Sequence, residues 1–380
     1  MDIYPERIPV AGPSISAREA ELCAEAALEA WYGDHYKYNA RFEQMVADYC
    51  GVKHAVSLPH CTAALHLALA AAGVKSGDEV IVPDVTWIAS VAPVTYVGAT
   101  PILVESRTDT WCIDTDACRK AINKATKAII AVNLYGSMCD WDGLRELARE
   151  HDLFLLEDSA EAIGSEYRGL RAGALGHAAT FSFHGSKTIA TGEGGMLVTD
   201  DDALHARVLF LRDHGRDPGD RFFRNIEIGF KYRMSGVTAA LGCAQMERID
   251  EMIEAKRRIF GWYRDRLGGH HALTINSEPD GVKNSYWMVT ACVDPTLGLD
   301  KFTLMAKMSE RNIDTRPFFS PLSSLPAFEN LPRSKQFCRP DSPMSRLSAH
   351  AINLPSGYNM DEAKVDFVCK SFIEIINAVA

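Results

Sequence analysis

VKHAVSL (residues 52–58), TAALHLALAAAG (62–73) and EVIVP (79–83) place an alanine-rich run between two short β-branched runs. Short strands that are apolar throughout are typical of parallel sheets, in which helices cover both faces. The alternation continues along the chain. Further strands are predicted at 100–105, 128–136 and 152–158, and helices at 86–98 and 141–151. The pattern therefore predicts an α/β fold built on a mostly parallel sheet.

Two helices are expected before this core. Ser16 and Glu19 have the spacing of a capping box, which satisfies the backbone N–H groups at the start of a helix. A helix is therefore expected from this box to about Trp31, and a second one from Asn39 to just before Gly51.

The rest of the chain extends the sheet and adds a smaller unit. Two strands are predicted at 178–183 and 194–200, then a long loop at 212–225 and one long helix from about Ser235 to Leu267. A strand at 284–293 and helices at 300–311 and 361–378 follow. The predicted fold is a three-layer α/β/α large domain, residues 1–250, with a smaller α+β C-terminal domain, residues 251–380.

The composition disfavours several classes of function. The 380 residues are 47% hydrophobic and carry a formal charge of −10, which argues against a nucleic-acid or anionic-membrane partner. There is no run of 18 apolar residues and no signal-peptide pattern, and the ten cysteines form no C-x-x-C pair, so a cytoplasmic location is expected. The twelve histidines lack metal-ligand spacing, so no metal is expected.

The stretch FSFHGSKTIATGEGGM (181–196) sets a lone lysine, Lys187, between an apolar run and a glycine-rich turn. Ligands of open parallel sheets bind beyond the carboxyl ends of the strands. Other polar or aromatic residues fall at such ends. These candidates are Cys61, Thr62, Trp87, Asp158 and Ser182.

A lysine, a carboxylate, an aromatic ring and a helix N-terminus together indicate pyridoxal 5′-phosphate. Lys187 would form the Schiff base, and Asp158 would keep the ring nitrogen protonated, at about 1.4 kcal/mol for each pKa unit. Trp87 offers a face for the ring, and the hydroxyls of Thr62 and Ser182 could bind phosphate beside helix N–H groups. Taken singly, each residue has an ordinary structural explanation as a cap, a solvated amine or a core aromatic. Their joint occurrence at successive strand ends indicates the cofactor.

Longer motifs carry a resemblance to the nucleotide-sugar aminotransferases, which covers about residues 8–378. The motifs are VKHAVSL…TAALHLAL, GDEVIVPDVTWIAS, LLEDSAEAIGSEYRG, FSFHGSKTIATGEGGM, GFKYRMSGVTAALGCAQMERID and INLPSG. The resemblance implies a dimeric pyridoxal-phosphate enzyme of the aspartate-aminotransferase fold (fold type I). The chain is most similar to perosamine-synthase-type enzymes, which aminate C4 of a GDP-linked 4-keto-6-deoxy sugar. L-Glutamate is the donor, 2-oxoglutarate leaves, and pyridoxamine 5′-phosphate is the intermediate form of the cofactor. The implied role is amino-sugar biosynthesis for surface polysaccharide, such as lipopolysaccharide O-antigen, or for glycosylated products.

The resemblance also assigns roles by position. Lys187 becomes the Schiff-base lysine, Asp158 the partner of the pyridine nitrogen, and Glu161 a neighbour of the ring's 3-hydroxyl. The implied cofactor ligands also include Cys61, Thr62, Trp87, Ser182 and Lys231, and the implied substrate ligands are His184, Arg316 and Ser320. Since the family builds each active site from two subunits, segment 212–233 is expected to reach the partner in a homodimer, where Lys231 would contact the phosphate.

Three positions depart from the family's pattern. Cys61 stands where the phosphate turn has glycine, Lys231 where asparagine is common, and Ser320 where the RPxFHP motif has histidine. The nucleotide, the sugar and the choice between C3 and C4 amination stay open. Two alternatives are also open: amination of another keto sugar or a cyclitol, and a non-catalytic regulatory paralogue of the same fold.

Overall fold

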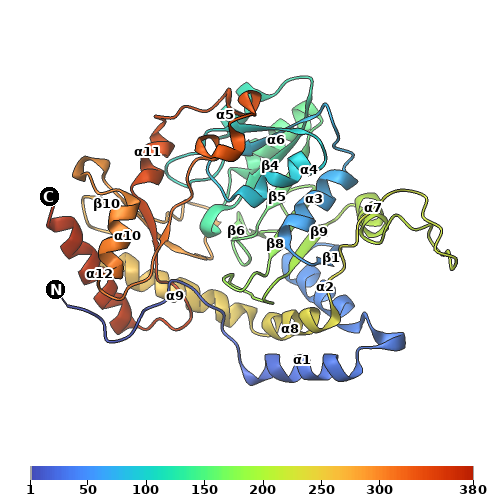
Figure 1. The fold of residues 1–380 in the computed structure, drawn as a ribbon, viewed down its shortest axis with the longest axis horizontal. Helices are drawn as coiled ribbons and strands as arrows, with labels where there is room; N and C mark the ends of the chain where they lie inside the picture. The colour runs from blue at the N-terminus through green and yellow to red at the C-terminus, as the bar shows by residue number, and fades with distance from the viewer. Residues whose placement is uncertain (1, 380) are drawn as a thin grey trace.

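A seven-stranded sheet forms the centre of the computed structural model, which describes residues 2–379 (Figure 1). Its strand order is β1-β9-β8-β5-β4-β2-β3. The strands are β1 (His54–Leu58), β2 (Glu79–Pro83), β3 (Thr100–Val104), β4 (Thr126–Val132), β5 (Phe154–Asp158), β8 (Ala178–Ser182) and β9 (Gly195–Thr199). Only β9 runs against the others, because it pairs antiparallel with both β1 and β8. The predicted, mostly parallel sheet is confirmed.

Helices cover both faces of this sheet, as the apolar strands require. Along β4, Ile129 and Ala131 pack into one core, whereas Ala128 and Ile130 pack into the core on the opposite face. One core takes residues from α2, α5, α6 and α8, and the other takes residues from α3, α4 and α7. The helices are α1 (Ala17–Glu29), α2 (Lys37–Cys50), α3 (Cys61–Ala71), α4 (Ala92–Tyr96), α5 (Thr115–Ala121), α6 (Trp141–His151), α7 (Asp202–Arg212) and α8 (Gly236–Met246). The predicted three-layer arrangement is therefore confirmed.

A second, antiparallel sheet of order β10-β12-β14-β13 lies in the C-terminal part of the chain. Its elements are β10 (Leu273–Ile275), β12 (Val289–Val293), β13 (Arg316–Pro317) and β14 (Ala351–Leu354), with α9 (Ile249–Leu267), α10 (Lys301–Ser309), α11 (Pro343–Ala349) and α12 (Glu362–Asn377). This part has its own core, which also contains Ile8 from the N-terminal segment. The two ends of the chain lie near each other at α12 (Figure 1), where Lys370 Nζ is 3.1 Å from Asp2 Oδ2. The domain boundary at residue 250 stays a prediction.

A small third sheet connects the two parts. Its order is β11-β6-β7, and its strands are β6 (Glu166–Tyr167), β7 (Leu170–Arg171) and β11 (Val282–Lys283). Because β6 and β7 follow β5 of the central sheet while β11 leads into β12, backbone pairing holds the two parts together.

The prediction of one long helix from Ser235 to Leu267 is wrong. The chain forms two helices, since α8 ends at Met246 and α9 begins at Ile249. The two residues between them are tied to the N-terminal segment. Glu247 accepts hydrogen bonds from Arg18 and Arg41, at 3.1 and 2.7 Å, and Arg248 Nη2 donates to Ser14 Oγ at 2.7 Å. These contacts fix the break, and α9 then leads away into the C-terminal core (Figure 1).

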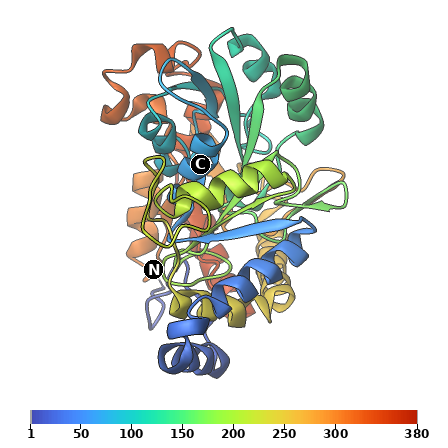
Figure 2. The same cartoon turned by 90° about the vertical axis from the view of Figure 1, so that its right-hand side faces the viewer.

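The helices predicted near the N-terminus are confirmed. Ser16 caps α1 and forms the full capping box with Glu19. The predicted loop at 212–225 is also confirmed, and it extends outward beyond α7 (Figures 1 and 2). Its apolar side chains face solvent, with Phe222 89% exposed, and Ile228 further on is 94% exposed. Helix α7 itself was not predicted.

Candidate functional site

The main cavity, of about 840 Å³, opens at the carboxyl ends of the parallel strands. Asp158 ends β5, Ser182 ends β8, and the turn after β2 leads into the cavity at Thr86. All ten predicted site residues other than Lys231 line this space. They are Cys61, Thr62, Trp87, Asp158, Glu161, Ser182, His184, Lys187, Arg316 and Ser320.

Lys187 projects into the cavity between an acid and an aromatic ring. Its Nζ lies 3.1 Å from Glu161 Oε1 and 3.6 Å from the centre of the Trp287 ring. The Trp287 indole is itself fixed, because its Nε1 donates to the carbonyl of Ser186 at 2.8 Å. The residue before Lys187 thus fixes the Trp287 ring beside the amine.

Asp158 is buried at the floor of the cavity, with 2% of its surface exposed. Its Oδ2 accepts a hydrogen bond from Ser90 Oγ at 2.6 Å, and its Oδ1 accepts one from the Ala160 N–H at 3.1 Å. Burial raises the pKa of Asp158, and the bonds from Ser90 and Ala160 and the charge of Lys187 partly oppose that rise. A cation placed beside this carboxylate would be strongly favoured.

Glu161 forms the second buried acid of the site. Its Oε2 accepts from the Tyr135 N–H at 2.9 Å, while Oε1 receives Lys187. Burial raises the pKa of Glu161 as well, and Lys187 opposes the rise. Tyr135 adopts a positive φ of 54°, a backbone conformation that turns its N–H toward this acid at the end of β4.

The N-terminus of α3 forms the opposite end of the cavity. His60 caps this helix by accepting the Ala63 N–H on Nδ1 at 3.0 Å, so Cys61 is the first helical residue. Gly195 of β9 lies against this end so closely that a Cβ would come within 2.6 Å of the Cys61 nitrogen. The glycine-rich turn therefore lets β9 approach the helix N-terminus, where Thr62 and Ser182 add hydroxyl groups.

Aromatic side chains and the segment after β13 form the outer wall. The Trp87 ring is 58% exposed, and its centroid lies 5.9 Å from that of Phe319. His184 Nδ1 lies 3.0 Å from Ser186 Oγ, and Ser320 Oγ lies 2.9 Å from Lys301 Nζ.

Lys231 is not brought to the cavity of its own chain. Its side chain is 59% exposed and its Nζ lies 3.7 Å from Asp213 Oδ1, in the segment that follows α7.

Several cavity residues were missed by the sequence analysis. Ser90 lies three residues after Trp87, so the one-turn spacing within TWIAS was a usable signal. Tyr135 falls near the end of the strand predicted at 128–136, so its place at a strand end was a usable signal too, whereas Trp287 and Asn353 reach the cavity from the C-terminal part of the chain and carry no such signal. Only the fold brings them to Lys187.

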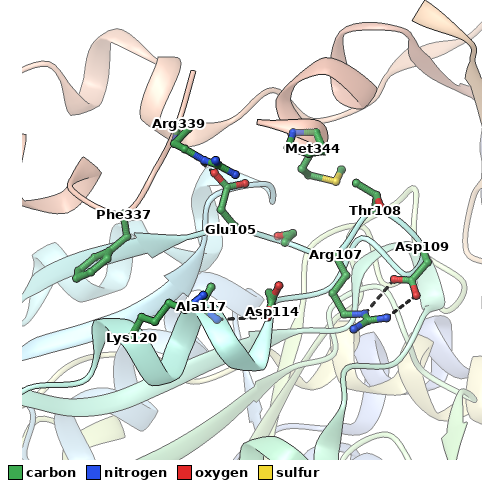
Figure 3. A pocket seen from close by; sticks show the side chains of 12 residues that line it. Glu105, Arg107, Thr108, Asp109, Asp114, Ala117, Lys120, Phe337, Arg339 and Met344 are labelled. Carbon is green, nitrogen blue, oxygen red and sulfur yellow. Dashed lines mark hydrogen bonds and ion pairs between the residues drawn. The ribbon is translucent and has the colours of Figure 1, made fainter. Parts of the chain in front are cut away.

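A second hollow, of about 690 Å³, lies between the end of β3, α5 and segment 337–344 (Figure 3). Its three acidic side chains are already engaged locally. Arg107 binds Asp109, Asp114 caps α5 by accepting backbone N–H groups, and Glu105 accepts the Arg339 N–H at 3.2 Å. These groups hold the hollow's own walls together, whereas the lysine and buried acids lie in the main cavity.

The main cavity fits pyridoxal 5′-phosphate by its donor set. It offers one amine, a buried carboxylate for a ring nitrogen, an aromatic face, and a helix N-terminus with hydroxyls at the opposite end. Over residues 2–379 there is no grouping of three or more histidine, cysteine or acidic side chains that could hold a metal ion. Within the same residues, no helix is both long and apolar enough to span a membrane.

Comparisons with known proteins agree with this site. Residues 13–373 match the model of the DegT/DnrJ/EryC1/StrS aminotransferase family. The chain is 39% identical to GDP-perosamine synthase of Caulobacter vibrioides, over 97% of this chain and 98% of the relative, and 37% identical to that of Vibrio cholerae, over 98% and 100%. Among solved structures it superposes on the PMP form of Spr1654 from Streptococcus pneumoniae with a TM-score of 0.90, at 26% identity and covering 98% of each chain. The chain belongs to the DegT/DnrJ/EryC1/StrS aminotransferase family and is a pyridoxal-phosphate-dependent sugar aminotransferase.

Proposed function

We propose that the enzyme transfers the amino group of L-glutamate to C4 of a GDP-linked 4-keto-6-deoxy sugar, as a perosamine synthase does. The names of the relatives support this substrate, since three that are 37–39% identical over nearly the whole chain are GDP-perosamine synthases. The observation that carries the proposal is the position of Lys187, whose Nζ lies 3.1 Å from Glu161 at the same cavity edge as Asp158.

The cofactor, when bound, supplies an aldehyde that condenses with amines and a ring that withdraws electrons from the reacting carbon. In this proposal Lys187 holds the cofactor covalently between turnovers. Its Nζ then takes the proton from the donor's Cα and, in the second half of the reaction, gives a proton to the sugar carbon. Glu161 accepts a hydrogen bond from that Nζ and keeps it aimed at the reacting atoms.

Asp158 would hold the proton on the ring nitrogen, because the low dielectric of the buried site strengthens the attraction between its carboxylate and a cationic ring. Trp87 would pack on the cofactor ring. The N–H groups of Cys61 and Thr62 and the hydroxyls of Thr62 and Ser182 would hold its phosphate. Cys61 stands where the family's phosphate turn has glycine. Because Cys61 is the first residue of α3, its backbone N–H still points out of the helix end.

His184, Arg316 and Ser320 bind the nucleotide sugar in this proposal, and the site is completed in a homodimer. Two exposed apolar residues in the segment that follows α7, Phe222 and Ile228, support such an interface. Lys231 would then contact the phosphate of the partner's cofactor as a point charge. We further propose that the enzyme works in the cytoplasm, in the synthesis of amino sugars for surface polysaccharide such as O-antigen or for glycosylated products.

The test is a panel of GDP-, UDP- and dTDP-linked 4-keto-6-deoxy sugars incubated with the holoenzyme and L-glutamate, with products read by mass spectrometry. The GDP-linked acceptor should give the amino sugar and 2-oxoglutarate in equal amounts. Lys187→Ala should abolish the reaction, whereas Lys370→Ala, an exposed lysine paired with Asp2, should retain it. Amination of another acceptor in preference to the GDP sugar, or full activity of Lys187→Ala, would refute the proposal.

A further inference from the structure

Lys301 is a buried lysine without a counter-ion. Only 5% of the residue is exposed, and no carboxylate oxygen among residues 2–379 lies within 4 Å of its Nζ. It is also the first residue of α10, where the helix dipole disfavours a positive charge. A buried cation in such a place is costly unless a partner compensates for it.

The contacts of Lys301 lead to the wall of the main cavity. Its Nζ donates to the carbonyl of Phe318 and to Ser320 Oγ, both at 2.9 Å. An ammonium group has no lone pair and can only donate, so it makes Ser320 Oγ the acceptor of this bond. The hydroxyl hydrogen of Ser320 is then left to donate elsewhere, and Ser320 lines the cavity.

Arg316 adds a second positive group to this wall. It belongs to β13, four residues before Ser320, and also lines the cavity. Within the described residues its guanidinium takes part in no ion pair and no protein hydrogen bond. Of the three acids that line the cavity, Asp158 and Glu161 are engaged with Ser90 and Lys187, and Glu193 forms no ion pair within the described residues. Arg316 therefore brings a positive charge without an ion-pair partner among the described residues to this wall, and Lys301 lies buried behind the wall in contact with Ser320.

We propose that Lys301 and Ser320 form an anion-binding site, in which Lys301 polarises the Ser320 hydroxyl and that hydroxyl donates a hydrogen bond to an anionic oxygen of a substrate. Lys301 is the positioning residue and Ser320 makes the contact. The identity of the anion depends on the proposed function, because that reaction brings two anionic ligands to one cavity: the carboxylates of the amino donor and the diphosphate of the nucleotide sugar. A hydroxyl held this way presents a donor where the family motif has a histidine ring.

A double-mutant cycle on the holoenzyme tests this anion-binding site by measuring ligand affinity rather than turnover. Ser320→Ala, Lys301→Met and the double variant are titrated with GDP and, separately, with 2-oxoglutarate, and dissociation constants are measured by calorimetry. We expect Ser320→Ala and Lys301→Met each to weaken one of these ligands by about tenfold, the scale of a hydrogen bond to a charged group. The double variant should be no weaker than Lys301→Met, since both changes remove the same bond.

Control variants separate this effect from a general loss of structure. Ser324→Ala removes an exposed hydroxyl that bonds only the Pro321 carbonyl, and Lys307→Met removes another lysine of α10. Both control variants should bind GDP and 2-oxoglutarate as tightly as the wild type does. Ser320→Thr, which keeps a hydroxyl, should retain the affinity that Ser320→Ala loses. If Lys301→Met does not fold, Lys301→Gln takes its place in the cycle, and Ser320→Ala tests the contact of Ser320 with the anion by itself.

The two ligands identify the source of the anion. If Ser320→Ala and Lys301→Met lose affinity for GDP alone, the anion-binding site is assigned to the diphosphate. If they lose affinity for 2-oxoglutarate alone, it is assigned to the carboxylates of the amino donor. Unchanged affinity of Ser320→Ala for both ligands, or additive effects of the two substitutions, would overturn the proposal. A wrong assignment of the sugar acceptor would instead appear only in the product panel.

Discussion

Removing the Ser90 hydroxyl tests how the chain keeps Asp158 ionised. Ser90 Oγ donates to Asp158 Oδ2 at 2.6 Å in a buried setting, and a hydrogen bond to a charged group contributes about 1.5–3 kcal/mol. Ser90→Ala should therefore raise the pKa of Asp158 further, because the carboxylate loses a hydrogen-bond donor that favours its charged form. If Asp158 holds the proton of the ring nitrogen, the affinity for pyridoxal 5′-phosphate should fall about 10- to 100-fold.

The assay is a titration of cofactor-free protein with pyridoxal 5′-phosphate, followed by tryptophan fluorescence and by cofactor absorbance at several pH values. Ser324→Ala serves as the matched control, because its exposed hydroxyl makes only a local bond. In an Asp158→Asn background, Ser90→Ala should have much less effect, since the carboxylate it stabilises is gone. Cofactor affinity within twofold of the wild type, with the same pH profile, would refute the reasoning.

Three further predictions concern stability. Burial raises the pKa of Asp158 above its unfolded value of about 3.9, so the folded, cofactor-free protein binds more protons than the unfolded chain does. Its free energy of unfolding should therefore fall as the pH rises from the unfolded pKa of Asp158 to the folded one. Urea unfolding at several pH values should show a smaller fall for Asp158→Asn. Burial lowers the pKa of Lys256 to about 7, below its unfolded value of about 10.4. The free energy of unfolding of the wild type should therefore rise relative to that of Lys256→Met between about pH 7 and pH 10. Parallel pH profiles of unfolding free energy for the two proteins would contradict this. Gly195→Ala should destabilise the fold by about 1–3 kcal/mol, because its Cβ would lie 2.5 Å from the His60 carbonyl carbon. Gly261→Ala has open space around it in α9 and should stabilise the fold by up to about 1 kcal/mol. Equal unfolding midpoints for the two variants would argue against the close approach of β9 to the start of α3.

The parts of the fold that depend on local pattern were predictable. Strands β2, β5 and β8 contain apolar runs that indicate a parallel sheet, and the parallel topology places their carboxyl ends at one edge, so Asp158 at the end of β5 and Ser182 at the end of β8 could be assigned to the cavity. The break between α8 and α9 was not predictable in this way. No glycine or proline marks Glu247 and Arg248, and the break depends on contacts with Arg18 and Ser14 that lie more than 200 positions away in the chain.

The same distinction applies to the site. Lys187 and Asp158 carry chemistry in their side chains and stand next to recognisable strand ends. Trp287 and Lys301 act through where they lie: one ring stands 3.6 Å from an amine, and one amine lies 2.9 Å from a hydroxyl. Residues whose importance is purely positional leave no trace in composition or spacing, so only the three-dimensional arrangement reveals them.

The acids Glu157, Asp158 and Glu161 stand within five consecutive positions, and burial raises the pKa of each. A cationic ring beside Asp158 would relieve part of the electrostatic cost of burying these acids, so occupancy by pyridoxal 5′-phosphate would shift the folding equilibrium as well as enable chemistry. Vitamin B6 supply would then govern how long each copy of the enzyme survives proteolysis, and a shortage of the vitamin would lower the cell's stock of the protein as well as its specific activity.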